Sequence, residues 1–142
     1  MTKRILVPVS EDGHSAAVPL VRGVARDQGS TVRLLMVMPV PERVVGPHGR
    51  TVAYADQEME RLTAQGLDEL AVAESELAGV PVERVVRFGE PVEEILTEAE
   101  AFDADLIALG AGRSSRLQSA FTPGVAERVA RAAPVPTLTL RG

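Results

Sequence analysis

The sequence predicts an α/β fold, in which helices cover both faces of a parallel, doubly wound sheet. Two observations predict it. Short apolar runs rich in branched residues alternate with longer stretches whose apolar residues recur every three or four positions. This alternation of buried strands and amphipathic helices is typical of an α/β/α sandwich. The 142 residues, 45% hydrophobic and 25% charged, are expected to form a single domain over residues 1–142.

The first strand is expected at residues 5–9, an apolar run that is followed by a polar turn. A helix is expected next, because apolar side chains recur at helical spacing: Ala17, Leu20, Val21, Val24 and Ala25. Ser15 is the predicted N-cap of this helix, and Gly29 is placed to end it.

Residues 31–38 are expected to form the second strand. Residues 39–53 are predicted to be a long loop, because they contain Pro and Gly and show no period. The next helix is predicted from an apolar stripe: Met59, Leu62, Gly66, Leu70, Ala73 and Leu77. Gly79 is expected to end it, and residues 82–88 form the third predicted strand.

Pro91 is expected to begin a helix whose first turn holds two glutamates, which suits the positive end of the helix dipole. Residues 105–110 are the fourth predicted strand and run into a loop with Gly and Ser. Thr122-Pro123 is a start signal for another helix, and residues 137–140 form the last predicted strand.

Composition excludes several functions. The chain has no cysteine and two distant histidines, so we expect no disulfide, iron–sulfur cluster or other metal site. Lys3 is the only lysine, which excludes a P-loop lysine. Residues 56–109 carry 3 basic and 15 acidic side chains, which argues against a nucleic-acid partner. No secretory signal or membrane-length apolar run is found, so we expect a cytoplasmic protein with no membrane partner.

Several short motifs resemble those of the universal stress protein family. In chain order they are Ile5-Leu6-Val7-Pro8-Val9 with His14-Ser15, Leu34-Leu35-Met36-Val37, Gly89-Glu90-Pro91, Asp105-Leu106-Ile107-Ala108-Leu109-Gly110, Val125-Ala126-Glu127-Arg128-Val129 and Ala133-Pro134-Val135-Pro136. Each motif alone is weak, but their joint order and spacing cover essentially the whole chain. The resemblance implies a five-stranded sheet of order 3-2-1-4-5. It also implies a homodimer joined through the last strand, with Val135, Leu138 and Leu140 at the interface.

Some members of that family bind ATP through the pattern Gly, two residues, Gly, nine residues, Gly, then Ser or Thr, with an Asp directly after the first strand. Aligned without gaps from Gly110, this chain has Arg113 at the second glycine, Pro123 at the third and Gly124 at the hydroxyl residue. Ser10 stands at the Asp position. Arg113 fills space that a phosphate loop needs, and Pro123 donates no N–H. The sequence therefore predicts weak or absent ATP binding.

An alternative is a nucleotide-dependent switch that binds ATP, with Mg²⁺, and hydrolyses it slowly or not at all. Arginine and serine side chains could hold phosphates in place of bare backbone. The candidate nucleotide-binding residues are Pro8, Val9, Ser10, Val37, Gly110, Gly112, Arg113, Ser114, Ser115 and Gly124.

No nucleophile, base and orienting partner are found together, so no catalytic residue is predicted. The leading hypothesis is a non-enzymatic stress-response protein with no required cofactor. It would act as a homodimeric module that binds another protein or a small anionic ligand.

Overall fold

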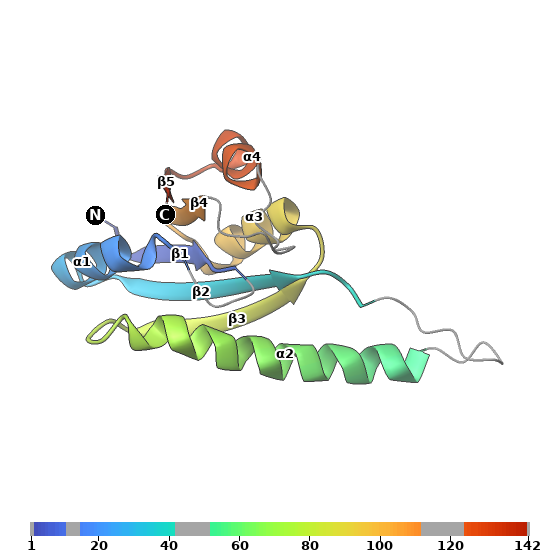
Figure 1. Cartoon of the computed structure of the whole chain (residues 1–142). Helices are drawn as coiled ribbons and strands as arrows, with labels where there is room; N and C mark the ends of the chain where they lie inside the picture. Colours follow the sequence, from blue (N-terminus) through green and yellow to red (C-terminus); the bar gives the residue numbers. More distant parts are fainter. Residues whose placement is uncertain (1, 11–14, 42–51, 112–123, 142) are drawn as a thin grey trace.

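The computed structural model describes residues 2–10, 15–41, 52–111 and 124–141. Five parallel strands form one sheet in the order β3-β2-β1-β4-β5, which confirms the order that the resemblance implied. The strands are β1 (Arg4–Pro8), β2 (Thr31–Met38), β3 (Val82–Phe88), β4 (Leu106–Ala111) and β5 (Thr137–Arg141). The helices are α1 (Val18–Gln28), α2 (Val52–Ser75), α3 (Pro91–Phe102) and α4 (Val125–Ala132). Figure 1 shows the helices packed around the sheet.

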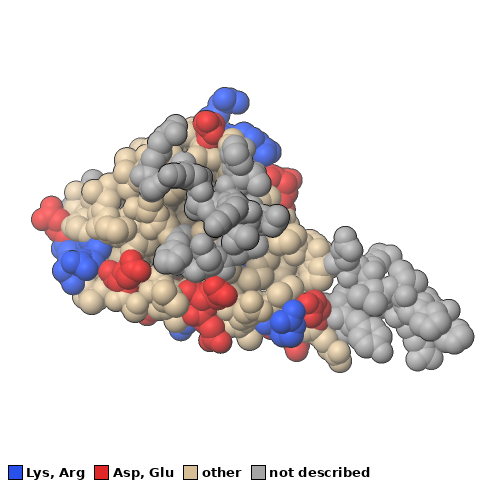
Figure 2. Space-filling view, in the orientation of Figure 1, with Lys and Arg blue, Asp and Glu red and all other residues tan. Residues whose placement is uncertain are grey.

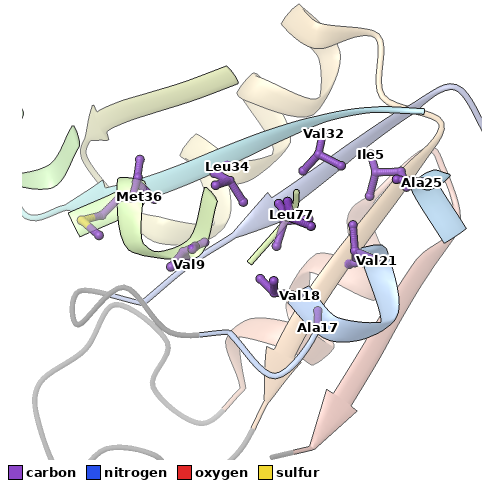
Figure 3. Close-up of a cluster of buried hydrophobic side chains, with 14 of the residues drawn as sticks. Ile5, Val9, Ala17, Val18, Val21, Ala25, Val32, Leu34, Met36 and Leu77 are labelled. Carbon is purple, nitrogen blue, oxygen red and sulfur yellow. The ribbon is translucent and has the colours of Figure 1, made fainter. Parts of the chain in front are cut away.

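The sheet separates two hydrophobic cores. Because neighbouring residues of a strand point to opposite faces, β1 supplies Ile5 and Val7 to one core and Leu6 to the other. The first core lies under α1 and α2, and Figure 3 shows its side chains from α1 and the strands. The second core lies under α3 and α4. The predicted α/β/α sandwich is therefore confirmed.

The ends of α1 and α3 follow from local sequence. Gly29 ends α1 in the left-handed conformation, with φ of 67°, as predicted. Pro91 is the first residue of α3, also as predicted, and the Glu90 side chain accepts hydrogen bonds from two N–H groups of the first turn. The prediction for Ser15 was wrong. Helix α1 begins at Val18, and the Ser15 hydroxyl accepts the N–H of Ala17 before the helix starts, at 3.2 Å.

Helix α2 also differs from its predicted bounds. Its first two residues, Val52 and Ala53, lie within the stretch 39–53 that was predicted as a loop; residues 42–51 of that stretch lie outside the described residues. The helix ends at Ser75 rather than at Gly79, because the N–H groups of Glu76 and Leu77 bond three residues back and tighten the chain into a turn. The predicted helix start at Thr122-Pro123 lies outside the described residues.

Most of the acidic surplus is on the surface of the helices, as the sequence indicates for a solvated face. Figure 2 shows acidic side chains along the rim that α2 occupies and basic ones over α4. Among the acidic residues that the structure describes, Glu98 is the exception, because its side chain is buried on the inner face of α3. Among the described helices, none combines the length and the apolar composition that crossing a membrane requires.

Candidate functional site

The sheet opens between β1 and β4 at the carboxyl ends of the strands. Strand β1 pairs with β2 from Arg4 to Pro8, but it pairs with β4 only at Ile5 and Leu6. Chain order also reverses here, since β2 and β4 lie on opposite sides of β1. In open α/β sheets, ligands bind outside the carboxyl ends of the strands at such a switch point. This opening is the candidate site.

Gly110 lies where the chain leaving β1 packs against the end of β4. A Cβ on Gly110 would lie 2.8 Å from the backbone nitrogen of Ala16 and 3.2 Å from the Ser15 hydroxyl oxygen. Any other residue would therefore displace backbone, which is costly. Packing alone explains this glycine, so its presence is no evidence for a phosphate.

The residues predicted to line an adenosine are mostly buried. Val9 belongs to the core under α1 and α2, whereas Val37 belongs to the core under α3 and α4, so their side chains lie on opposite faces of the sheet. Pro8 is buried as well. The N–H of Val9 donates to the carbonyl of Leu35 at 2.8 Å, which extends the β1–β2 pairing past Pro8. Ser10, half-buried, is the next residue along the chain.

Gly124 stands immediately before α4 as its N-cap. Its φ is 99°, in the left-handed region that favours glycine, and a Cβ there would meet nothing within 4 Å. The obstacle to a Ser or Thr at this position is therefore backbone strain and not lack of room. The other candidate phosphate ligands, at positions 112–115, lie outside the described residues.

Beneath α3, an ionic network that the sequence analysis missed surrounds the buried carboxylate of Glu98. Arg33 of β2 and Arg87 of β3 both donate to Glu98, and Arg87 reaches it at 2.9 Å. Arg33 also donates to Glu83 at 2.8 Å, and Arg87 donates to Glu94 at 2.7 Å. Every group of this network has a partner of opposite charge, so it joins α3 to two strands without leaving a buried charge unpaired.

The arginines are held firmly in their charged form. Burial alone would lower the pKa of Arg33, but its hydrogen bonds to Glu83 and Glu98 raise it. The hydrogen bond to Glu94 raises the pKa of Arg87 against its own burial. The guanidinium carbon of Arg33 also lies 4.2 Å from the ring centre of Phe102. These contacts make the network structural.

The sequence did contain a signal for this network. Arg33 shares its alternation in β2 with the inward-facing Leu35 and Val37, and Glu94 and Glu98 lie four residues apart on one face of α3. Arginines on the inner face of predicted strands, together with glutamates at helical spacing, indicate buried ion pairs.

The predicted interface residues lie on or beside β5, at one edge of the sheet. Leu138 and Leu140 are half-buried in the strand, and Leu140 packs against the core under α1 and α2. Val135 lies just before the strand and packs against the opposite core. Within the described part of the chain, no three His, Cys, Asp or Glu side chains form a cluster able to hold a metal ion.

Comparisons with known proteins agree with this fold. The search of curated proteins found no match. Among solved structures, hypothetical protein MJ0577 is 25% identical with a TM-score of 0.77, over 100% of this chain and 97% of that one. A universal stress protein in complex with cAMP is 16% identical with a TM-score of 0.60, over 99% and 97%. The universal stress protein from Archaeoglobus fulgidus in complex with dAMP is 20% identical with a TM-score of 0.58, over 96% of each chain. The family model of the universal stress proteins matches residues 1–141, and the chain belongs to this family.

Proposed function

We propose that this protein is a cytoplasmic, single-domain, non-enzymatic binding module of a stress response, which acts as a homodimer and does not hold ATP tightly. The observation that carries the proposal is Gly124. It stands where the ATP-binding pattern has Ser or Thr, supplies no hydroxyl group, and has a backbone conformation that disfavours either residue.

Three further departures support weak ATP binding. Ser10 replaces a carboxylate, which is the stronger acceptor for a ribose hydroxyl. Pro123 removes a backbone donor, and Arg113 adds a side chain where bare backbone is expected. The loss of one charge-assisted hydrogen bond costs about 1.5–3 kcal/mol, or roughly tenfold or more in affinity.

Titration calorimetry with ATP, ADP and AMP tests this proposal. We expect no saturation by ATP below about 1 mM, and no adenine nucleotide in the supernatant after the purified protein is denatured. The variant Arg113→Gly/Pro123→Gly is expected to bind ATP more tightly than the natural chain, because it restores a bare backbone and an N–H. Micromolar ATP binding by the natural chain would contradict the proposal.

The dimer is proposed to form through β5. This edge strand consists of Thr and Leu up to its last residue, Arg141, and contains no acidic residue or lysine. Such an uncharged edge presents unpaired backbone groups and needs a cover. A second β5, related by a twofold axis, would continue the hydrogen bonding and close the assembly at two chains.

Light scattering on two arginine variants tests this interface. Leu138→Arg places a charge in β5 and is expected to give monomers. The matched control is Val72→Arg, which places the same charge on the outer face of α2, where Val72 is 52% exposed, and is expected to leave the dimer intact. A dimer that survives Leu138→Arg would place the interface elsewhere.

The alternative function is a nucleotide-dependent switch. Two observations favour it: the sheet opens at its switch point, and solved structures of similar fold hold cAMP and dAMP. Each of those ligands has one phosphate group, so it needs fewer contacts from the loop that follows β4 than ATP does. Titration with cAMP and AMP separates the two functions. Micromolar binding that Arg113→Ala weakens would favour the switch.

A further inference from the structure

The two edges of the sheet differ in charge. The edge strand β5 is uncharged up to its last residue, whereas β3, the opposite edge strand, contains three charged residues: Glu83, Arg84 and Arg87. Consecutive residues of a strand point to opposite faces, so these charges border the β3 edge on both sides.

Each of the three side chains is bound to a neighbouring element. Arg84 reaches α2, where it meets Glu74 at 3.0 Å and the carbonyl of Leu67 at 3.0 Å. On the other face, Glu83 binds Arg33 of β2, and Arg87 binds α3.

These contacts leave the charges at the surface. The side chain of Glu83 is 50% exposed, that of Arg84 39% and that of Arg87 31%. Arg87 is accounted for by its bond to the buried Glu98. Exposed ion pairs contribute little to stability, so stability alone is a weak account of Glu83 and of the Arg84–Glu74 pair. A second chain that paired with β3 would have to strip water from these groups on both faces.

We infer that the charged side chains close the β3 edge to a second copy of this chain. The rest of β3 is Val82, Val85, Val86 and Phe88, a composition typical of strands that add to an open edge. If both edges could pair, β5-to-β5 and β3-to-β3 contacts would alternate without end and produce filaments. The charges on β3 therefore limit the assembly to two chains.

The variant Glu83→Thr/Arg84→Thr tests the inference, because it removes two of the charges while Arg87 keeps its place in the buried network. Light scattering across a hundredfold range of protein concentration is expected to show the mass rising past that of the natural assembly, to at least twice its value at the highest concentration. A mass equal to that of the natural protein at every concentration, with an unchanged circular dichroism spectrum, would overturn the inference. If the double variant does not fold, Arg84→Thr alone is measured in the same way and judged by the same outcomes.

The charge-swapped variant Glu83→Arg/Arg84→Glu is the matched control. It breaks the same two ion pairs but keeps two charges on the edge, so its mass is expected to stay at the natural value. A mass of this variant that rises above the natural value would show that a loosened β3 causes association whatever its charge, and would also overturn the inference.

The conclusion that the assembly stops at two chains rests on the proposed β5 dimer. The closure of the β3 edge does not depend on it. Adding Leu138→Arg to Glu83→Thr/Arg84→Thr separates the two proposals. If both hold, this triple variant forms dimers through β3, whereas Leu138→Arg alone is monomeric. If Leu138→Arg alone stays dimeric, the β5 interface is wrong, and the comparison of the double variant with the natural chain still tests the β3 edge.

Discussion

The packing of α2 on the sheet depends on Gly66, and a Gly66→Ala substitution measures how closely the two approach. A Cβ at this position would lie 2.9 Å from Met38 Cε and 2.9 Å from Val86 Cγ2. Ordinary carbon–carbon contacts are about 3.5–4.0 Å, so the helix or its neighbours must move by roughly 0.6–1.1 Å. The methionine can move its flexible end, but the branched Val86 has little freedom.

Two opposing effects set the expected stability of the Gly66→Ala variant. Overpacking of a core costs about 1–3 kcal/mol. Replacement of a helical glycine by alanine contributes about 1 kcal/mol in the other direction. The net expectation is a loss of about 0–2 kcal/mol in the free energy of unfolding.

Gly23 in α1 provides the control. A Cβ there meets nothing within 4 Å, so Gly23→Ala should give only the helical gain of about 1 kcal/mol. Urea unfolding followed by far-UV circular dichroism suits this chain, which has no tryptophan. Both variants are compared at one protein concentration, because a dimer's apparent stability depends on concentration.

The difference between the two alanine variants isolates the packing cost, expected at about 1–3 kcal/mol. The packing cost of Gly66→Ala should be smaller when it is measured in a Val86→Ala background, since the removed methyl groups make room for the new Cβ. If Gly66→Ala stabilises the protein as much as Gly23→Ala does, then α2 does not approach the sheet this closely and the reasoning is refuted.

Three further predictions concern charged residues. Glu98→Gln should lower the free energy of unfolding by about 2–3 kcal/mol. This loss is smaller than that expected for breaking a fully buried ion pair, because Arg33 and Arg87 each keep a second glutamate. A loss below about 0.5 kcal/mol in urea unfolding would refute this. Hydrogen bonds from two backbone N–H groups hold the pKa of Asp105 below its ordinary value of 3.8, so its stabilisation is present above that value and is lost as pH falls through the lower folded pKa. Between pH 7 and pH 2.5, the melting temperature of the Asp105→Ala variant should therefore fall by less than that of the natural protein. An equal fall in both proteins would contradict this. Asp103 ends α3 with φ of 57°, in the left-handed region that favours glycine. Asp103→Gly should therefore raise the melting temperature, and Asp103→Ala should lower it. The reverse order would contradict backbone strain at this position.

Hydrophobic periodicity predicted the fold well, because the spacing of apolar residues directly reflects which face of each element is buried. All five strands and four helices were found, and Gly29 and Pro91 were correctly placed at helix ends. The starts of the helices were predicted less accurately than their presence. Ser15 was predicted as a cap, but Ala17 occupies the cap position of a helix that begins at Val18, and the Ser15 hydroxyl accepts the N–H of Ala17 instead.

The candidate site was harder to predict than the fold. Sequence spacing identified Gly110 and Gly124, but only the structure shows that Gly110 accommodates Ala16 and that Gly124 has positive φ. Close approach and backbone conformation depend on tertiary contacts that no pattern of residue types records. The network around Glu98 was missed for a related reason, since its members are separated by up to 65 residues.

The position of β1 in the sheet has a consequence for synthesis. Of the five strands, β1 is translated before the others, yet it lies in the middle of the sheet. Asp105 accepts the N–H of Lys3, just before this strand, from 102 residues further along the chain. Until β4 has emerged, one side of β1 therefore remains open, with apolar residues on both faces. Long-range pairings of this kind fold slowly and expose surfaces prone to aggregation. The nascent chain is expected to be most vulnerable to misassembly during the translation of the segment that separates β3 from β4.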